Sequence, residues 1–358
     1  MHSGQKILEP YVIAETAYNH EGDLQYLKRM IIKASELEIS AIKFHVLMDI
    51  DSYFQNNHPL REKLSPLLFS ESQWDEIISL SSKRGLDIII LCDDIHSLDF
   101  VLKRQNEISA IEIHAVSINE VFMLKKVCSF DGEVILGIGG CSLDEIEFAV
   151  HFLEKHGQDQ IILMYGFQNY PTNYQEISIS KMIKIRDLFN REMGYADHTS
   201  YDDERNIQIS TIAAANGFNV LEKHFTLDEG IQRLDFHAAV GEEKMQKIVD
   251  SMRVALEAYG DNSLKMSESE KKYGQIGPMK KAIVAKRDIE AGEKLALNKL
   301  CFKRTNRESY IEQRKIFNLL GSSVNQTIKQ DEIIDYSRIE YSFKKLNEKD
   351  FTNIDEKK

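Results

Sequence analysis

Cysteine is scarce in this 358-residue chain, and the spacing of the cysteines indicates neither a set of disulfide bonds nor a metal site. The four cysteines, Cys92, Cys128, Cys141 and Cys301, include no CxxC pair and no dense framework. Reduced thiols in a cytoplasmic protein are therefore the expected state.

An excess of positive charge is also lacking. The net charge is -12, with 45 Lys and Arg against 57 Asp and Glu. This balance argues against a nucleic-acid-binding protein, although a local cationic pocket could still hold a small anion. No apolar run reaches the roughly 18 residues of a membrane span, and no N-terminal segment resembles a signal peptide. We therefore expect a cytoplasmic protein with no membrane partner.

Short apolar runs do occur, and they alternate with amphipathic stretches up to about residue 260. Leu24, Leu27, Met30 and Ile31 share one face of a helix that Asp23 can cap. Eight strand-then-helix units in a row predict an α/β protein built on a TIM (β/α)₈ barrel. No GxGxxG follows the first run, which disfavours a dinucleotide-binding fold. The predicted strands are 11–14, 41–44, 88–91, 110–113, 134–136, 161–164, 194–196 and 219–222.

The pattern changes after residue 260. Residues 261–280 are expected to form a polar linker, 281–343 a small β-rich domain, and 344–358 a charged tail. Gly292 ends the first strand-like unit, and glycine readily adopts positive φ there. Asp331 stands at the matching point of a second, similar unit, which suggests internal pseudo-symmetry.

Two histidines, His198 and His224, end the last two strand-like runs of the barrel. Active sites of such barrels lie at the C-terminal ends of the strands. Two converging imidazoles could bind Mn²⁺, Zn²⁺ or Fe²⁺ there. From the residues alone, ordinary core or surface histidines are the alternative.

Six motifs in order resemble the sialic acid synthase family. They are IAETAYNHEGD (13–23), AIKFH (41–45), YPT (170–172), GYADHT (194–199), LEKHFT (221–226) and LDFH (234–237). The resemblance implies a TIM barrel followed by an antifreeze-like (SAF) domain, paired as a domain-swapped homodimer. It implies condensation of phosphoenolpyruvate (PEP) with the open-chain aldehyde of an N-acetylated hexosamine. A divalent metal would assist, Mn²⁺ first, with Mg²⁺, Co²⁺ or Zn²⁺ as alternatives.

The resemblance also implies roles for individual residues. His198 and His224 match metal ligands, and we count Glu15, Lys43 and Asp197 as catalytic candidates. For Glu15, the alternative is a helix cap or a buried ion pair. Asn19 and His20 belong to the first motif. They could contact substrate, or they could only order the first loop.

Five residues are predicted to bind substrate, namely Tyr170, Gln168, Asp235, Arg304 and His45. Tyr170 and Asp235 match sugar contacts, and Gln168 is matched to an asparagine near YPT. Arg304 matches an SAF-domain arginine that reaches the sugar of the partner subunit. His45 stands where the family has glutamine.

The chain departs from the family where PEP would be held. Leu91, Glu112, Ala115, Gly137 and Ala196 replace hydroxyl or lysine donors. A hydrogen bond to a charged group contributes about 1.5–3 kcal/mol, so several losses together would weaken PEP binding severely. Three hypotheses follow: PEP in a rearranged pocket; metal-dependent aldol cleavage, isomerisation or epimerisation of a sugar without PEP; or a non-catalytic sugar-binding dimer.

Overall fold

The computed structural model describes residues 9–167, 169, 171–261 and 263–341. Contacts divide the chain into two units, Met1–Ser263 and Leu264–Lys358. Among the described residues, no helix has the length and apolar character needed to cross a membrane.

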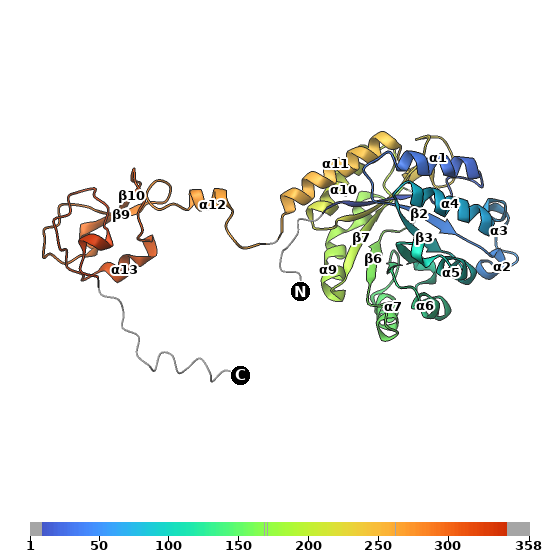
Figure 1. Cartoon of the computed structure of the whole chain (residues 1–358), viewed down its shortest axis with the longest axis horizontal. Coiled ribbons are helices and arrows are strands. Elements are labelled where there is room, and N and C mark those ends of the chain that lie inside the picture. Colours follow the sequence, from blue (N-terminus) through green and yellow to red (C-terminus); the bar gives the residue numbers. More distant parts are fainter. Residues whose placement is uncertain (1–8, 168, 170, 262, 342–358) are drawn as a thin grey trace. The chain divides into compact units, whose positions relative to one another are not determined.

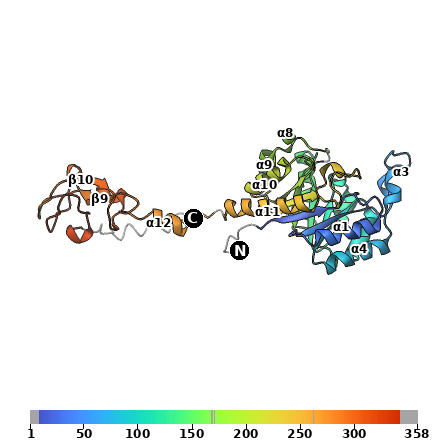
Figure 2. The same ribbon diagram turned by 90° about the horizontal axis from the view of Figure 1, so that it is seen from above.

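All eight predicted strands form, and they close a parallel barrel in chain order (Figures 1 and 2). Glu15 pairs with His224, which joins the last strand to the first. Each strand differs from its predicted range by at most two residues at an end. The strands are β1 Tyr11–Glu15, β2 Ala41–Val46, β3 Asp87–Cys92, β4 Ala110–Ile113, β5 Glu133–Gly137, β6 Ile161–Tyr165, β7 Glu192–Asp197 and β8 Val220–His224.

Helices surround the barrel, as Figure 1 shows. In α1, the Asp23 side chain accepts hydrogen bonds from the backbone N–H groups of Gln25 and Tyr26, which confirms the predicted cap. The helices of this unit are α1 Leu24–Ala34, α2 Ile50–Tyr53, α3 Arg61–Leu64, α4 Glu71–Lys83, α5 Ile95–Leu102, α6 Val121–Val127, α7 Leu143–Lys155, α8 Tyr174–Ile177, α9 Ile179–Phe189, α10 Arg205–Ala215 and α11 Glu242–Tyr259.

Two apolar layers hold this unit together, one between the strands and the helices and one inside the barrel. Because successive strand residues face opposite sides, a residue two positions from an interior apolar side chain also points inward. The inner layer is small, so polar side chains occupy the rest of the interior near the C-terminal strand ends. The inner layer consists of Ile13, Ala41, Ile89, Ala110, Ile135, Ile162, Met164, Ala196 and Val220.

The second unit contains an antiparallel pair, β9 Ala282–Ala285 and β10 Leu300–Lys303, and a short helix, α13 Ile316–Leu319. Gly292 and Asp331 both have positive φ, at 86° and 68°, as the two repeated turns require. Helix α12, Glu268–Tyr273, lies where the sequence predicted a linker. Its start is a capping box in which Ser267 and Glu270 satisfy each other's backbone N–H groups.

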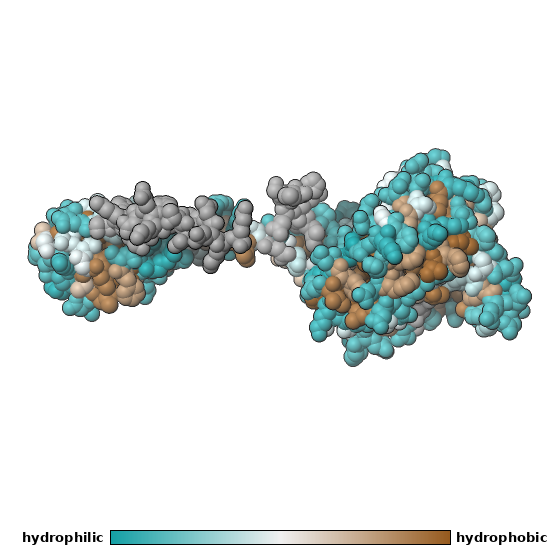
Figure 3. Space-filling model, turned by 90° about the horizontal axis from the view of Figure 1, so that it is seen from below, coloured by the Kyte–Doolittle hydropathy of each residue, from teal (hydrophilic) through white to brown (hydrophobic). Residues whose placement is uncertain are grey.

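The outer surface of the barrel carries apolar patches among hydrophilic residues, part of which Figure 3 shows. Val121, Phe122, Leu143 and Phe148 are large exposed apolar residues on α6 and α7. Exposed apolar patches of this kind often mark association surfaces. The domain-swapped homodimer remains a prediction.

Candidate active site

A buried lysine is surrounded by three glutamates inside the barrel. Nζ of Lys43 lies 2.8 Å from Oε2 of Glu15, 2.7 Å from Oε2 of Glu112 and 2.6 Å from Oε2 of Glu222. None of the four residues is more than 5% exposed. Each follows an inner-layer apolar residue by two positions, so strand alternation turns all four inward. We call Glu15, Lys43, Glu112 and Glu222 the charged layer.

The charged layer keeps Lys43 protonated. Burial alone would favour the neutral amine, but the carboxylates of Glu112 and Glu222 outweigh it and raise the pKa of Lys43. An ammonium group is not a nucleophile, so Lys43 is unsuited to forming a covalent imine with substrate. Its chemistry here is electrostatic.

A line of polar contacts leads from the charged layer to the first loop. Nε2 of His45 lies 3.6 Å from Oε1 of Glu15, and its Nδ1 lies 3.7 Å from Oδ2 of Asp93. The hydroxyl of Tyr18 donates a 2.9 Å hydrogen bond to the same Asp93 oxygen. Glu15 also accepts a hydrogen bond from the backbone N–H of Ala17. These contacts bring His45 and Glu15 together, as a shared site requires.

His198 and His224 lie side by side at the ends of β7 and β8, with ring centroids 5.1 Å apart. Burial lowers the pKa of His198 to about 4 and that of His224 well below its usual value. Both imidazoles are therefore neutral at neutral pH, which is the form that binds a metal. Among the residues that the structure describes, no group of three or more His, Cys, Asp or Glu is arranged to hold a metal ion. Any ion here would have an open coordination sphere.

Asp197 faces away from the barrel interior, unlike the other two catalytic candidates, Glu15 and Lys43, and its catalytic role remains a prediction. Its Oδ1 accepts hydrogen bonds from the backbone N–H and the hydroxyl of Thr199, at 2.8 and 2.7 Å. Its Oδ2 lies 3.3 Å from Nζ of Lys223, which is itself buried and directed outward. Alternation explains the difference, because its neighbours Ala196 and His198 take the inward positions. Asp197 orders the turn that carries His198.

Loop residues connect the first and last strands at the mouth of the barrel. Asn19 donates to the backbone carbonyl of Leu234 and accepts from Thr226. His20 stacks on Phe69, with centroids 4.8 Å apart, and accepts from the backbone N–H of Gly22. These contacts support the loop-ordering interpretation of Asn19 and His20.

Asp235 also lies at this junction. Its Oδ2 is 3.4 Å from the backbone N–H of Tyr18, and its φ is positive at 62°. Burial raises the pKa of this carboxyl group. Asp235 therefore lies at the mouth of the barrel, as its predicted role requires. Its contact with the sugar remains a prediction.

The remaining predicted substrate residues are Arg304, Gln168 and Tyr170. Arg304 belongs to the second unit, where its guanidinium donates to the backbone carbonyl of Pro278. Its reach across a dimer remains a prediction. Gln168 and Tyr170 lie outside the described residues. Asn169, between them, donates to Glu176.

The positions expected to hold phosphate contain no hydroxyl or cationic donors. Leu91 is buried among the strands, and Glu112 belongs to the charged layer. A Cβ added to Gly137 would lie 3.0 Å from the backbone nitrogen of Ala115 and 3.2 Å from Oε1 of Glu112. A side chain at position 137 would therefore require the Ala115 backbone and the Glu112 side chain to shift by a few tenths of an ångström.

The neighbouring loops pack backbone against backbone. A Cβ on Gly139 would lie 1.6 Å from the carbonyl oxygen of Gly166. A Cβ on Gly166 would lie 2.3 Å from the carbonyl oxygen of Ala196. Glycine is required at both positions because only hydrogen fits there.

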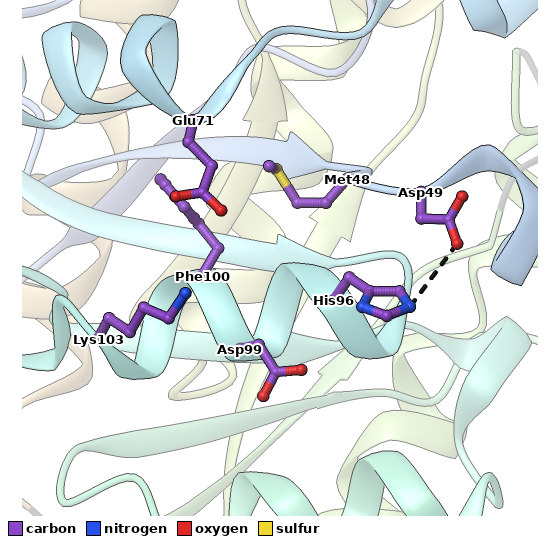
Figure 4. A pocket seen from close by; sticks show the side chains of 7 residues that line it. All are labelled: Met48, Asp49, Glu71, His96, Asp99, Phe100 and Lys103. Atoms are coloured by element: carbon purple, nitrogen blue, oxygen red, sulfur yellow. Dashed lines mark ion pairs between the residues drawn. The ribbon is translucent and has the colours of Figure 1, made fainter.

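A surface pocket of about 490 Å³ lies apart from these residues, between α4, α5 and the segment after β2 (Figure 4). Its His96 faces Asp49, with Nε2 and Oδ2 3.6 Å apart. No predicted site residue lines it. The lining residues are Met48, Asp49, Glu71, His96, Asp99, Phe100 and Lys103.

Glu222, Tyr18 and Asp93 were not predicted as site residues from the sequence, and Glu112 was predicted only as the replacement of a phosphate-binding donor. The structure shows all four within the connected polar network around Lys43 and His45. The inward alternation from Ala110 to Glu112 and from Val220 to Glu222 was the available signal.

Comparison with known proteins gives consistent results. A model of the NeuB family matches residues 33–264. An N,N'-diacetyllegionaminic acid synthase from Campylobacter jejuni is 30% identical over 338 residues, covering 90% of this chain and 98% of that protein. A second such synthase, from Legionella pneumophila, is 26% identical and covers 92% of this chain and 94% of its own length.

Solved structures agree with these relatives. The crystal structure of an N-acetylneuraminic acid synthetase from Leptospira borgpetersenii, in complex with citrate, is 25% identical, with a TM-score of 0.68. The match covers 75% of this chain and 90% of that one. A putative spore coat polysaccharide biosynthesis protein from Chromobacterium violaceum has a TM-score of 0.78 at 18% identity, covering 93% of this chain and 100% of its own, which shows a shared fold.

Proposed function

Because this chain belongs to the NeuB family, we propose that it joins a three-carbon enol donor to the open-chain aldehyde of an N-acetylated hexosamine, giving a nonulosonic acid. The observation that carries this proposal is the convergence of Glu15, Lys43, His198 and His224 at the C-terminal strand ends. Family membership supports PEP as the donor. In that form, PEP, water and the aldehyde give the product and inorganic phosphate.

The two histidines fit a divalent cation. Both are neutral imidazoles at the ends of adjacent strands, which suits a transition-metal ion. The resemblance favours Mn²⁺ first, with Mg²⁺, Co²⁺ or Zn²⁺ as alternatives. Water and sugar oxygens would complete the ligand set, so we expect weak, exchangeable binding. When bound, the ion would act as a Lewis acid toward the aldehyde oxygen.

The protein's own groups would manage protons and orientation. Glu15 is held by Lys43 and by the backbone N–H of Ala17, so its carboxylate has a fixed position from which to accept a proton. His45 lies between Glu15 and Asp93 and could carry that proton toward the mouth. Asp235 and Asn19 would shape the sugar side of the mouth.

A second candidate is metal-dependent chemistry on a sugar without PEP, such as aldol cleavage. The specific observation in its favour is that Lys43 is surrounded by the protein's own carboxylates. Aldol cleavage is the reverse of condensation with an unphosphorylated donor. The two candidates therefore share the sugar and metal sites and differ in the donor.

A product assay tests the proposal. The purified full chain would be incubated with Mn²⁺, a panel of N-acetylhexosamines and either PEP or pyruvate, and products would be identified by mass spectrometry. We expect a product with the mass of the sugar plus the three-carbon unit, lost on chelation and in the His198→Ala variant. The His96→Ala variant, changed in the separate surface pocket, should retain activity. Absence of product from every combination would rule the proposal out.

A further inference from the structure

Large exposed apolar side chains concentrate on one side of the barrel. Among the described residues of the first unit, eleven large apolar side chains are exposed, and five of them lie between positions 116 and 148. This side carries α6 and α7, and Figure 3 views it from below, where apolar patches interrupt the hydrophilic surface. We call these five residues, Val116, Val121, Phe122, Leu143 and Phe148, the apolar patch.

The apolar patch is continuous across two helices. Helices α6 and α7 pack side by side. The side-chain amide of Asn119 donates a 2.9 Å hydrogen bond to the backbone carbonyl of Glu145, which fastens the turn that carries Val116 to the first turn of α7. Phe122 is 75% exposed and Phe148 is 46% exposed. An exposed apolar area shared by two helices is typical of a surface that associates with another macromolecule.

The charges beside the apolar patch differ in sign between the two helices. Lys125 is exposed on α6, and Asp144 and Glu147 are exposed on α7. An acidic partner would be repelled by α7, and a basic partner would be repelled by α6. A uniformly charged protein and an anionic membrane surface therefore fit only half of this face. A second copy of this chain has both signs of charge in the same arrangement, so it can satisfy both halves.

The spacing of residues along the helices allows the chain to pair with itself. Each helix returns from the C-terminal end of one barrel strand to the start of the next, so α6 and α7 run in the same direction. A twofold axis normal to the patch therefore sets α6 of one copy antiparallel to α7 of the other. Phe122 and Lys125 are separated by about 4.5 Å along α6, and Asp144 and Phe148 by about 6 Å along α7. In the antiparallel arrangement, Phe122 faces Phe148 of the partner subunit while Lys125 faces Asp144 of the partner subunit.

We propose that two copies of this chain associate through the apolar patch as a twofold pair. Each contact occurs twice in such a pair, because both copies use the same surface. The aromatic side chains lose their exposure to water, and the opposite charges beside them fix the register. The net charge of -12 repels copies that approach in other orientations. This association is separate from the expected domain-swapped homodimer, which uses the second unit, and it does not depend on the proposed chemistry.

Sedimentation of the full chain over a dilution series tests the proposal. Phe122→Asp should halve the mass of the assembly and weaken association at least about 100-fold, because it would bury a carboxylate against an aromatic ring. If the swapped dimer also forms, the change is from tetramer to dimer, and otherwise it is from dimer to monomer. Val254→Asp, at a residue of α11 that is 67% exposed, is the matched control and should keep the wild-type mass.

Reversal of charge tests the pairing itself. Lys125→Glu and Asp144→Lys should each weaken association, because each places like charges opposite one another, and the double variant should restore it. Restoration requires that the two positions face each other across the interface. If Phe122→Asp does not fold, as judged by circular dichroism, the charge variants still decide, because they leave the apolar side chains intact.

Three results would overturn the proposal. The first is a wild-type chain that stays monomeric at every concentration, and the second is an unchanged mass in folded Phe122→Asp. The third is a loss of mass in the single charge variants that the double variant does not restore. That third result would show that a different surface, such as the second unit of another copy, covers the apolar patch.

Discussion

The side chains of Lys43 and Glu112 form an ion pair inside the barrel, with Nζ and Oε2 2.7 Å apart and each side chain at most 4% exposed. The pair joins β2 to β4, which are not neighbours in the sheet. It therefore crosses the inner face of β3, and the other carboxylates extend the same connection to β1 and β8.

Replacing Lys43 with Met should destabilise the fold strongly. The three carboxylates would remain buried without a counter-charge, and breaking one side of a buried ion pair costs about 3–5 kcal/mol. Urea denaturation of the barrel transition would measure this loss. Lys33→Met removes exposed ion pairs with Glu36 and Glu242 and should leave stability nearly unchanged. Equal stabilities for the two variants would show that the charged layer is not a structural element.

Removal of either His198 or His224 should abolish metal-dependent stabilisation. A ligand at about 100 times its dissociation constant stabilises the native state by about 2.7 kcal/mol. Thermal denaturation with and without Mn²⁺ would therefore show an upward shift for wild type and little shift for His198→Ala or His224→Ala. His96→Ala, at the separate surface pocket, should behave as wild type. A preserved shift in both site variants would place the metal elsewhere.

The pH dependence of stability should include a contribution from His20. Burial, with a smaller effect of nearby His45, lowers the pKa of His20 to about 4 from an unfolded value near 6.5. Above pH 6.5 His20 is neutral in both the folded and the unfolded chain, so it does not reduce the free energy of unfolding. As the pH falls toward 4, the unfolded chain binds a proton that the folded chain excludes, so stability is lost, with no further loss below pH 4.

His20→Phe separates this contribution from those of other groups. The variant keeps a ring against Phe69 but cannot titrate, so its loss of unfolding free energy between pH 7 and 4 should be smaller by about 3 kcal/mol. Chemical denaturation at several pH values measures the slope. Parallel curves for wild type and His20→Phe would show that His20 does not contribute.

Asp94 should contribute to stability through the hydrogen bonds that its carboxylate accepts. Its carboxylate caps α5 through the backbone N–H of Ser97 and also accepts from the backbone N–H of Asp49 and the hydroxyl of Ser52. Asp94→Ala should therefore cost about 2 kcal/mol in denaturant unfolding. Asp99→Ala, at an exposed partner of Lys126, should cost less than about 1 kcal/mol. An Asp94→Ala variant as stable as wild type would disprove the capping role.

The strands were predictable because their apolar runs are short and regularly separated by helical periodicity. The Asp23 cap and the turn residues Gly292 and Asp331 were predictable for the same local reason. Helix α12 was missed, although its Ser267 and Glu270 form a standard capping pair. Local patterns thus determined most of the fold.

The charged layer could not be obtained from local patterns. Lys43 and Glu222 are 179 residues apart, and their contact depends on barrel closure and strand register. Asp197 shows the converse case, because its adjacency to His198 in sequence places its side chain on the opposite face of the strand. Motif membership identified the region of the site, but only register decided which side chains share it.

The close approach of Gly139, Gly166 and Ala196 also constrains how this protein can change over generations. Any side chain introduced at position 139 or 166 must displace the backbone of a neighbouring loop before it can contribute a functional group. Single substitutions there would be removed by selection on folding, whatever they offered to catalysis. New donors at this side of the barrel would therefore require coordinated changes in several loops, so the backbone, more than the side chains, limits which activities can evolve from this enzyme.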